Sequence, residues 1–535
     1  MDPVRSGWYQ VDDRSPDVSD GALVRALQHL DTPFAVVRAN GKLGVATGGR
    51  LVLGGPAPSP GAVPTLAWVP ALPPHRLGDP SFQRDYGVRV NYVAGAMANG
   101  IGSAEIVIAM AKAGMLGFFG AAGLNTARIE AAVDRIQREV GSLPYGFNLI
   151  HSPHEPHQEQ QTVELYLQRG IHVVSTSAYM GLTPSVVQFR ATGMKRRPDG
   201  SIEAPNKILA KVSREEVAIR FLEPPPASML DALVAQGRIT AEEARLAAQM
   251  PMADDLTAEA ASGGHTDNQA APVLLPLLLA LRDRICQARG YAQPVRVGAA
   301  GGIGSPAAVA GAFAMGAAYI VTGSVNQACI EAGTSDLVKQ MLTTAAAPDV
   351  GMAPASDMFE RGVQVQVLKR GTLFAMRAQR LYTVYREYDR WDDVPDDVKT
   401  EITDRVLQRT FDAVWNDCRD FFAERDPSQV ARAEKDARHK MALVFRWYLG
   451  LSSHWAIAGD SDRRLDAQVW CGPAIGAFNS WTRDTFLAEA SNRTVVGVAA
   501  NLMAGAAALT RARWLLHQGV DAGMNAGRWI PRPVT

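Results

Sequence analysis

Two glycine-rich turns carry the strongest chemical signal in this sequence, because both follow apolar stretches and both can approach an anion. The first contains Gly301 and Gly302 and leads into a helix that begins near Pro306, and the second contains Gly323 and Ser324. Glycine lets backbone N–H groups come close to a negative charge, and a helix N-terminus adds positive potential. We therefore expect the two turns to hold one phosphate group.

The spacing of the first turn also fits another kind of phosphate site. Its glycines follow the pattern Gly-x-x-Gly-Gly-x-Gly, which resembles a dinucleotide-binding turn. Such a turn requires an Asp or Glu at the end of the next strand to bind a ribose hydroxyl, and no acidic residue occurs from 305 to 330. Paired phosphate-binding turns after successive strands are instead typical of a β/α barrel. Tight packing of the glycines is the remaining alternative.

His265 is the residue best suited to proton chemistry. It follows Ser262-Gly263-Gly264 after an apolar stretch, so its imidazole sits on a loop where it could donate a proton or polarise a carbonyl. An ordinary loop histidine is the alternative. His151, His154 and His157 also lie close together, but the intervening prolines and the lack of a paired acidic ligand set favour a polar surface loop over a metal site.

Four further residues could surround a flat aromatic ring. Ala96 and Met97 lie among small residues, which would let a flavin ring rest against the backbone; a buried methionine is the alternative. Asn148 can both donate and accept hydrogen bonds, although it could simply end a strand. Lys211 lies in an otherwise apolar strand, where an unpaired charge is costly, so we expect an inward anionic partner or an outward, solvent-reaching side chain.

The elements that position these residues follow an alternating pattern of strands and helices. Eight alternations between residues 86 and 345 predict a closed β/α barrel, an eight-stranded TIM barrel of the α/β class. A helical insertion at 221–250 contains two expected helices, 227–236 and 240–249. The expected strands are 88–96, 114–119, 145–149, 172–176, 208–212, 255–260, 295–300 and 319–322.

Two flanking regions complete the expected organisation. Residues 1–85 contain a hairpin, 34–38 and 42–46, around Asn40-Gly41, and a Pro/Gly-rich linker at 54–61. Beyond 345 the strand signal fades, so residues 346–535 are expected to be mostly helical, with long helical stretches at 393–425, 429–449 and 492–518.

Composition narrows the functional classes. The 535 residues include 54 Lys+Arg and 54 Asp+Glu, so the chain has no general attraction for nucleic acid or anionic membranes. The N-terminus lacks the apolar core of a signal peptide, and the longest apolar run, 270–281, is shorter than the ~20 residues of a membrane span. Four cysteines lie far apart, as expected of buried thiols in a reducing cytoplasm. We expect a cytoplasmic protein.

Together these segments resemble a known superfamily, that of nitronate monooxygenases and flavin-dependent enoyl reductases. Segments beyond the barrel are similar to the PfaD family of trans-acting enoyl reductases in polyunsaturated fatty acid and polyketide synthases. The matching segments are Gly95-Ala96-Met97-Ala98, Gly117-Phe118-Phe119-Gly120, Phe147-Asn148-Leu149, Ser262-Gly263-Gly264-His265, Ala300-Gly301-Gly302-Ile303, Thr322-Gly323-Ser324, Pro251-Met252-Ala253-Asp254-Asp255, Phe445-Arg446-Trp447-Tyr448-Leu449-Gly450 and Trp470-Cys471-Gly472-Pro473-Ala474-Ile475-Gly476-Ala477-Phe478-Asn479.

The resemblance implies reduction of an α,β-unsaturated thioester on an acyl carrier protein, with FMN and with NADPH or NADH as hydride donor. It gives His265 the catalytic position and assigns the two turns to the FMN phosphate. Ala96, Met97, Asn148 and Lys211 correspond to positions at or near the flavin ring. An acidic residue usually precedes Ser-Gly-Gly-His in the family, whereas this chain has Ala261, which puts proton transfer in doubt.

A carrier protein is strongly acidic, so the resemblance also implies a basic docking patch. Its candidate residues are Arg432, Lys435, Arg438, His439 and Lys440; a solvated helix face balanced by Glu434 and Asp436 is the alternative. A homodimer is expected from general frequencies. Two other functions remain open: a nitronate monooxygenase-like flavoenzyme that uses oxygen, and a non-catalytic partner protein of a synthase.

Overall fold

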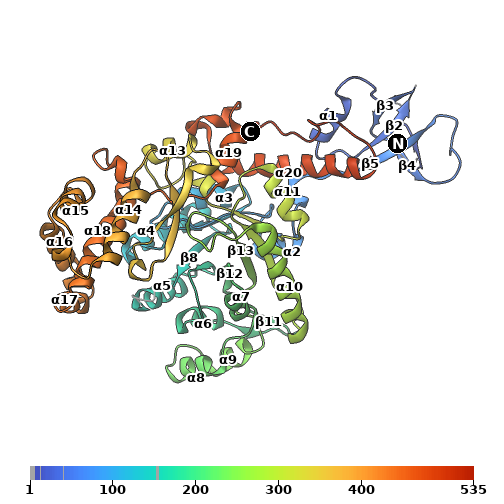
Figure 1. Ribbon diagram of the computed structural model, residues 1–535. Coiled ribbons are helices and arrows are strands. Elements are labelled where there is room, and N and C mark those ends of the chain that lie inside the picture. The colour runs from blue at the N-terminus through green and yellow to red at the C-terminus, as the bar shows by residue number, and fades with distance from the viewer. Residues whose placement is uncertain (1–6, 13, 40, 152–155, 535) are drawn as a thin grey trace.

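The computed structural model describes residues 7–534 apart from 13, 40 and 152–155, and its centre is a closed barrel (Figure 1). Eight parallel strands close the barrel, and each overlaps one predicted strand, which confirms the TIM-barrel fold. The strands are β6 (Tyr92–Ala94), β7 (Leu116–Phe119), β8 (Gly146–Ile150), β9 (Val173–Ser177), β12 (Lys207–Val212), β13 (Asp255–Glu259), β15 (Arg296–Ala300) and β16 (Ile320–Thr322).

Helices surround the barrel, and polar side chains fix where several of them begin. Ser103, Asn125 and Ser305 each accept a hydrogen bond from a backbone N–H in the first turn of α3, α4 and α11. The main surrounding helices are α3 (Ala104–Lys112), α4 (Thr126–Val140), α5 (Pro156–Gln168), α6 (Pro184–Ala191), α7 (Glu215–Leu222), α10 (Ala271–Arg289) and α11 (Pro306–Ala314). The predicted insertion is present as α8 (Ala227–Ala235) and α9 (Ala241–Ala247).

A buried ionic network closes the end of the barrel opposite the glycine turns. Arg296, at the start of β15, donates from Nε to Asp255 Oδ1 at 2.6 Å, and Asp255 lies at the start of β13 with no exposed surface. Tyr86, at the end of α2 (Pro80–Tyr86), donates to the other carboxylate oxygen at 2.5 Å. Because each charge is paired and hydrogen-bonded, both can be buried without a large energetic penalty. The network therefore holds together the starts of β13 and β15, at the end of the barrel opposite the glycine turns.

The N-terminal residues form a five-stranded antiparallel sheet. The predicted hairpin is present as β2 (Phe34–Ala39) and β3 (Lys42–Ala46), although Asn40 of its turn lies outside the described residues. The prediction of a linker at 54–61 is wrong, because these residues form a loop between two strands of the same sheet. Loops and linkers are both rich in proline and glycine, so composition alone did not distinguish them. The sheet order is β3-β2-β5-β1-β4, with β1 (Gly7–Gln10), β4 (Arg50–Leu53) and β5 (Ala62–Val69).

Helix α20 (Val495–His517) joins this sheet to the barrel, and Figure 1 shows it running between the two. Among the described residues it is the one helix long and apolar enough for a membrane span, yet 72% of its apolar window is buried within the protein. Its Arg511 donates to the carbonyls of His29 at 2.7 Å and Thr32 at 2.6 Å. The burial of its apolar window within the protein accounts for the apolar composition of α20.

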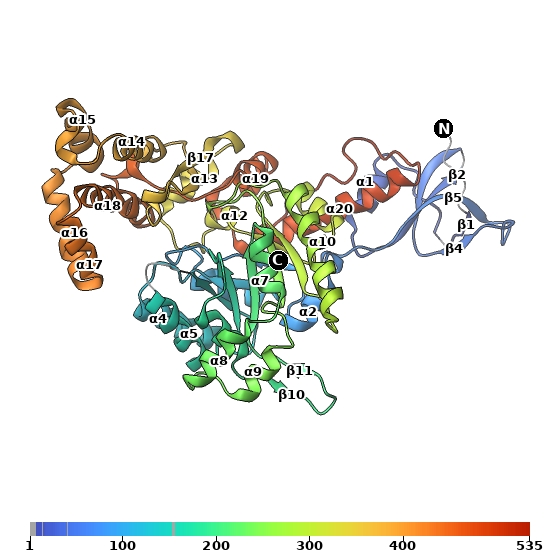
Figure 2. The ribbon, with the colours of Figure 1, turned by 60° about the horizontal axis from the view of Figure 1, so that its bottom comes forward.

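The C-terminal region is mostly helical, as expected, and it also contains two strands that the sequence analysis did not predict. Strands β17 (Val350–Pro354) and β18 (Gln364–Leu368) pair with each other, and β14 (Gly264–His265) adds to β18. Figure 2 shows the outer helices at the end of the molecule away from the N-terminal sheet. The main helices are α13 (Asp336–Thr343), α14 (Phe374–Glu387), α15 (Asp396–Glu401), α16 (Phe411–Arg425), α17 (Pro427–Ala433), α18 (Ala437–Ala458) and α19 (Ala474–Thr482).

Candidate functional site

His265 lies at the mouth of the barrel, on a short strand that the C-terminal region holds in place. In β14 it pairs with Val365 of β18, and Nε2 of His265 lies 3.1 Å from Oδ1 of Asp357. Asp357 belongs to the loop between β17 and β18, so it is 92 residues away in sequence. The side chains of His265 and Asp357 are 41% and 53% exposed, which leaves the imidazole accessible.

The neighbouring charges set the protonation state of this histidine. Partial burial alone would lower the pKa of His265, but the hydrogen bond and negative charge of Asp357, with a smaller contribution from Glu259, outweigh it and raise the pKa. For Asp357 burial opposes ionisation, yet the contact with His265 holds the pKa of the carboxyl below its usual value. Both shifts favour an imidazolium beside a carboxylate, which suits a proton donor.

Asp357 also bears on the substitution at residue 261. An acidic side chain next to the histidine is expected from the family pattern, and Ala261 cannot supply it. The carboxylate of Asp357 contacts His265 from another part of the chain instead. A carboxylate partner for His265 is therefore present, although it comes from residue 357 and not from residue 261.

The glycine turns divide into positions that pack and positions that face open space. A Cβ atom at Gly301 would lie 2.6 Å from the carbonyl carbon of Ala260, so this glycine is required for packing. At Gly302 and Gly323 a Cβ atom would meet nothing within 4 Å. Gly302 also has a φ of +72°, which L side chains rarely adopt. Bare backbone therefore borders open space at both turns, as a phosphate site requires.

The two turns lie side by side on one rim. They follow neighbouring strands, because Ala300 of β15 pairs with Val321 of β16. The hydroxyl of Ser324 accepts a hydrogen bond from the backbone N–H of Gly472 at 2.9 Å, which leaves its hydrogen available to donate. Ser305 caps α11 directly after the first turn, so the positive end of that helix points to the same place.

A C-terminal segment, residues 470–474, packs directly on this rim. A Cβ atom at Gly263 would lie 2.6 Å from Cα of Cys471, and one at Gly304 would overlap the carbonyl oxygen of Ala474. The segment is thus in backbone contact with the loop that carries His265 and with the first glycine turn. Only glycine at residues 263 and 304 lets the two backbones come this close. The loops of the barrel therefore carry glycine where the C-terminal segment packs against them.

Ala96 and Met97 lie half-buried in the loop after β6, next to the second turn. The N–H of Gly95 donates to the carbonyl of Thr322 at 2.8 Å, and the N–H of Gly102 donates to the carbonyl of Met97 at 2.9 Å. The loop is therefore fixed beside the second glycine turn.

The other two predicted ring contacts have partners within the protein. Asn148 is 5% exposed, and its Nδ2 donates to the carbonyl of Ser175 at 3.0 Å and to Ser177 Oγ at 2.7 Å. Lys211 Nζ lies 2.8 Å from Glu259 Oε1, so the inward anionic partner expected for this lysine is a carboxylate of the protein. Sequence reasoning missed Glu259, although it stands at the end of a strand beside the Ser-Gly-Gly-His loop.

The other histidine cluster has a different role. His151 Nδ1 lies 3.0 Å from Oε2 of the buried Glu159, and His157 is exposed on α5. His154 lies outside the described residues. In the described part of the chain, no group of three or more His, Cys, Asp or Glu side chains could hold a metal ion.

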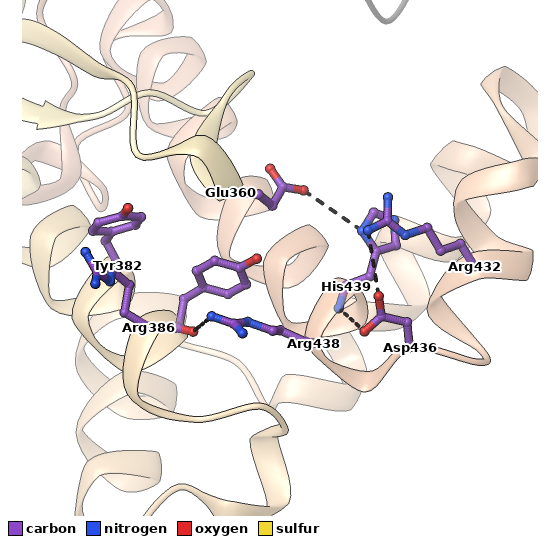
Figure 3. Close-up of a pocket in the computed structure, with 8 residues that line it drawn as sticks. Glu360, Tyr382, Arg386, Arg432, Asp436, Arg438 and His439 are labelled. Carbon is purple, nitrogen blue, oxygen red and sulfur yellow. Dashed lines mark hydrogen bonds and ion pairs between the residues drawn. The ribbon is translucent and has the colours of Figure 1, made fainter.

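The five predicted docking residues do not form one basic face, so that prediction is wrong. His439 is buried; Arg438 lies 3.0 Å from Asp389 and over the ring of Tyr385. Lys440 packs over Trp415, with its Nζ 5.2 Å from the ring centre. The five residues also do not share one helix: Arg432 lies in the last turn of α17, Lys435 in the turn that follows, and the other three at the start of α18 (Figure 3). Arg432 and Lys435 are exposed.

Comparison with known proteins identifies the family. Residues 88–404 match the family described as nitronate monooxygenase. The enoyl reductase domain of MlnA from Bacillus amyloliquefaciens is 38% identical, with a TM-score of 0.79, over 83% of this chain and 99% of that chain. This chain belongs to the nitronate monooxygenase family. Within the family it is PfaD-like, which confirms the resemblance predicted from sequence.

Two curated relatives extend the comparison. A polyunsaturated fatty acid synthase protein of Thraustochytrium is 48% identical over 81% of this chain, and PksE of Bacillus subtilis, a polyketide biosynthesis protein, is 41% identical over 82%. The chain spans 30% and 57% of the length of these two relatives. Residues 388–467 also match the inserted helical domain of [acyl-carrier-protein] S-malonyltransferase.

Proposed function

We propose that this chain is an FMN-dependent enoyl reductase that acts in trans on α,β-unsaturated thioesters carried by an acyl carrier protein, in polyketide or polyunsaturated fatty acid biosynthesis. The observation that carries the proposal is the His265–Asp357 pair on the same barrel mouth as two glycine turns that border open space. The similarity to the enoyl reductase domain of MlnA, over nearly the whole of that domain, supports the choice of reaction.

The residues of the rim fit FMN. The backbone N–H groups at Gly301, Gly302 and Gly323 and the hydroxyl of Ser324 would hold its phosphate, with Ala96 and Met97 against the ring. Asn148 and Lys211 would lie near the ring edge, Lys211 together with Glu259. FMN, reduced by NADPH or NADH, would supply a hydride to the β-carbon of the substrate.

His265 performs the proton half of the reduction. Its imidazolium donates a proton to the α-carbon, so that one hydride and one proton together saturate the double bond. Asp357 orients the ring and stabilises its positive charge. The 470–474 segment packs against the loop of His265 and narrows the rim.

The test is anaerobic reduction of a crotonyl chain on a carrier protein with NADPH, followed by mass spectrometry of the carrier. With the wild type we expect the acyl chain to gain two hydrogens. With His265→Ala we expect the rate to be at least about 100-fold lower, because general acid catalysis usually contributes at least that factor. His157→Ala, at an exposed histidine of α5, is the matched control and should leave the rate unchanged.

Two other outcomes would reject the proposal. Oxygen uptake with a nitronate, without thioester reduction, would make the chain a nitronate monooxygenase-like enzyme. A colourless protein that does not bind added FMN would make it a non-catalytic partner of a synthase. We also propose a cytoplasmic location and a homodimer; sedimentation of the purified protein tests the second.

A further inference from the structure

Two oppositely charged side chains, Lys211 and Glu259, point into the barrel at its mouth. Leu209 of β12 belongs to a buried cluster with residues of β6, β7 and β16, which are not neighbours of β12, so this cluster fills the barrel interior. Lys211 lies two residues after Leu209 and therefore points the same way. Along β13, Glu259 lies two residues after Thr257, whose hydroxyl is 2.8 Å from the hydroxyl of the interior Tyr319.

The two groups form a close ion pair. Nζ of Lys211 lies 2.8 Å from Oε1 of Glu259, and among the described residues neither side chain has another ion-pair partner. The same oxygen accepts a longer hydrogen bond, of 3.4 Å, from the hydroxyl of Ser262 in the loop that leads to His265. The side chains are 18% and 20% exposed. Because both lie at the carboxyl ends of their strands and point inward, the exposed part faces the mouth.

The pairing changes what the lysine presents to a ligand in the mouth. An unpaired ammonium group acts on its surroundings as a full positive charge, whereas a carboxylate 2.8 Å away offsets most of that charge at larger distances. A flavin ring gains negative charge when it is reduced, so a nearby cation favours its reduced form, and charge beside the ring is one means by which a protein tunes the cofactor.

We propose that Glu259 acts through Lys211 to lower the reduction potential of the bound flavin. The inference rests on the proposed function, because it requires FMN in the mouth. With a neutral pair beside the ring, the reduced flavin receives little stabilisation from charge and gives up its hydride more readily. Glu259 is thus a positioning residue, which holds the ammonium group and offsets its charge.

The same pair acts on His265 without any cofactor. Burial lowers the pKa of His265, and the carboxylates of Asp357 and Glu259 raise it, whereas the positive charge of Lys211 lowers it. Removal of one charge of the pair should therefore shift the pKa of His265 in the direction set by the charge that remains.

The main test is the midpoint potential of bound FMN, measured at pH 8 by anaerobic reductive titration of the full-length protein. Glu259→Gln keeps the size of the side chain and leaves Lys211 as an unpaired cation. The preference for reduced over oxidised FMN should increase about tenfold, which raises the potential by about 30 mV for a two-electron couple. Lys211→Met leaves an unpaired carboxylate and should lower the potential. The double variant should lie between the two single variants.

Glu203→Gln is the matched control. Glu203 pairs with Lys195 at 3.6 Å on the hairpin of β10 (Lys195–Arg196) and β11 (Ile202–Glu203), which projects from the barrel in Figure 2. The same loss of charge beside a lysine should leave the potential unchanged there. Equal potentials in the wild type, Glu259→Gln and Lys211→Met, or shifts in the opposite directions, would overturn the proposal. If one single variant does not fold, the other still tests the sign.

Nuclear magnetic resonance of labelled histidines gives a second measurement, which needs no FMN. The pKa of His265 should be lower in Glu259→Gln than in the wild type, and higher in Lys211→Met. An unchanged pKa in both variants would show that the pair does not face the site and would also reject the proposal. A wild type that binds no FMN defeats this inference together with the proposed function. Equal potentials in proteins that bind FMN and reduce the thioester defeat this inference alone.

Discussion

The replacement Asp357→Asn tests how the C-terminal region controls the proton donor. Asparagine keeps the size of the side chain and can still hydrogen-bond to His265, but it removes the negative charge that lies 3.1 Å from the ring. Without that charge, the partial burial of His265 is opposed only by the weaker influence of Glu259, so the pKa of the histidine falls.

The size of the effect follows from exposure. Because the two side chains are 41% and 53% exposed, water screens the pair, and its interaction is worth about 1 kcal/mol, the upper end of the range for exposed pairs. Since a pKa change of one unit corresponds to about 1.4 kcal/mol, the rate at a pH above the pKa of the histidine should fall by up to about fivefold, while the rate at low pH stays the same. In the His265→Ala background the same replacement should have no further effect, because the partner is already absent.

The direction of the effect appears in the dependence of the rate on pH. In the wild type the raised pKa of His265 keeps the ring protonated to higher pH, whereas in the variant the ring loses its proton at lower pH. The ratio of wild-type to variant rate should therefore increase as the pH rises from about 5 to 8. Asp412→Asn, at an exposed residue of α16, is the control. A profile that stays in place or moves to higher pH would refute the role of Asp357.

Three other replacements test the rim and the barrel. Gly302→Ala places a side chain at a φ of +72°, costs about 1 kcal/mol, and should weaken FMN binding in a fluorescence titration; unchanged affinity would remove Gly302 from the phosphate site. Gly263→Ala brings a Cβ within 2.6 Å of Cα of Cys471, so the loop of His265 must shift. We expect this replacement to lower the activity clearly while the melting temperature changes little. Arg296→Met leaves Asp255 buried without its cation, so urea unfolding should show a loss of about 3–5 kcal/mol.

The barrel was predictable because its signals are local. Each strand is a short apolar run, and each helix start has its own signal, such as Ser305 before Pro306. The insertion was equally readable, since Thr240 and Glu243 form a capping box at α9. Residues three or four apart decide these features, so one sequence is enough to place them.

The partner of His265 was not predictable, because no local pattern links residues 265 and 357. The strand that brings them together had a visible signal: 363–367 alternates valine with glutamine, as a half-buried strand does. A strand predicted from that alternation would still have had no known partner. The pairing of β18 with β14 depends on tertiary packing, which the local sequence does not show. Lys211 is similar: the need for an anion was readable, but Glu259 was not.

The C-terminal region therefore contributes residues to the candidate site and is more than an addition to a complete barrel. The barrel supplies the glycine turns and His265, but the carboxylate beside His265 comes from residue 357, and the segment on the rim comes from residues 470–474. The 470–474 segment approaches so closely that the barrel loops need glycine to admit it. Because the carboxylate of Asp357 raises the pKa of His265, the position of the loop between β17 and β18 helps to set the charge of the imidazole.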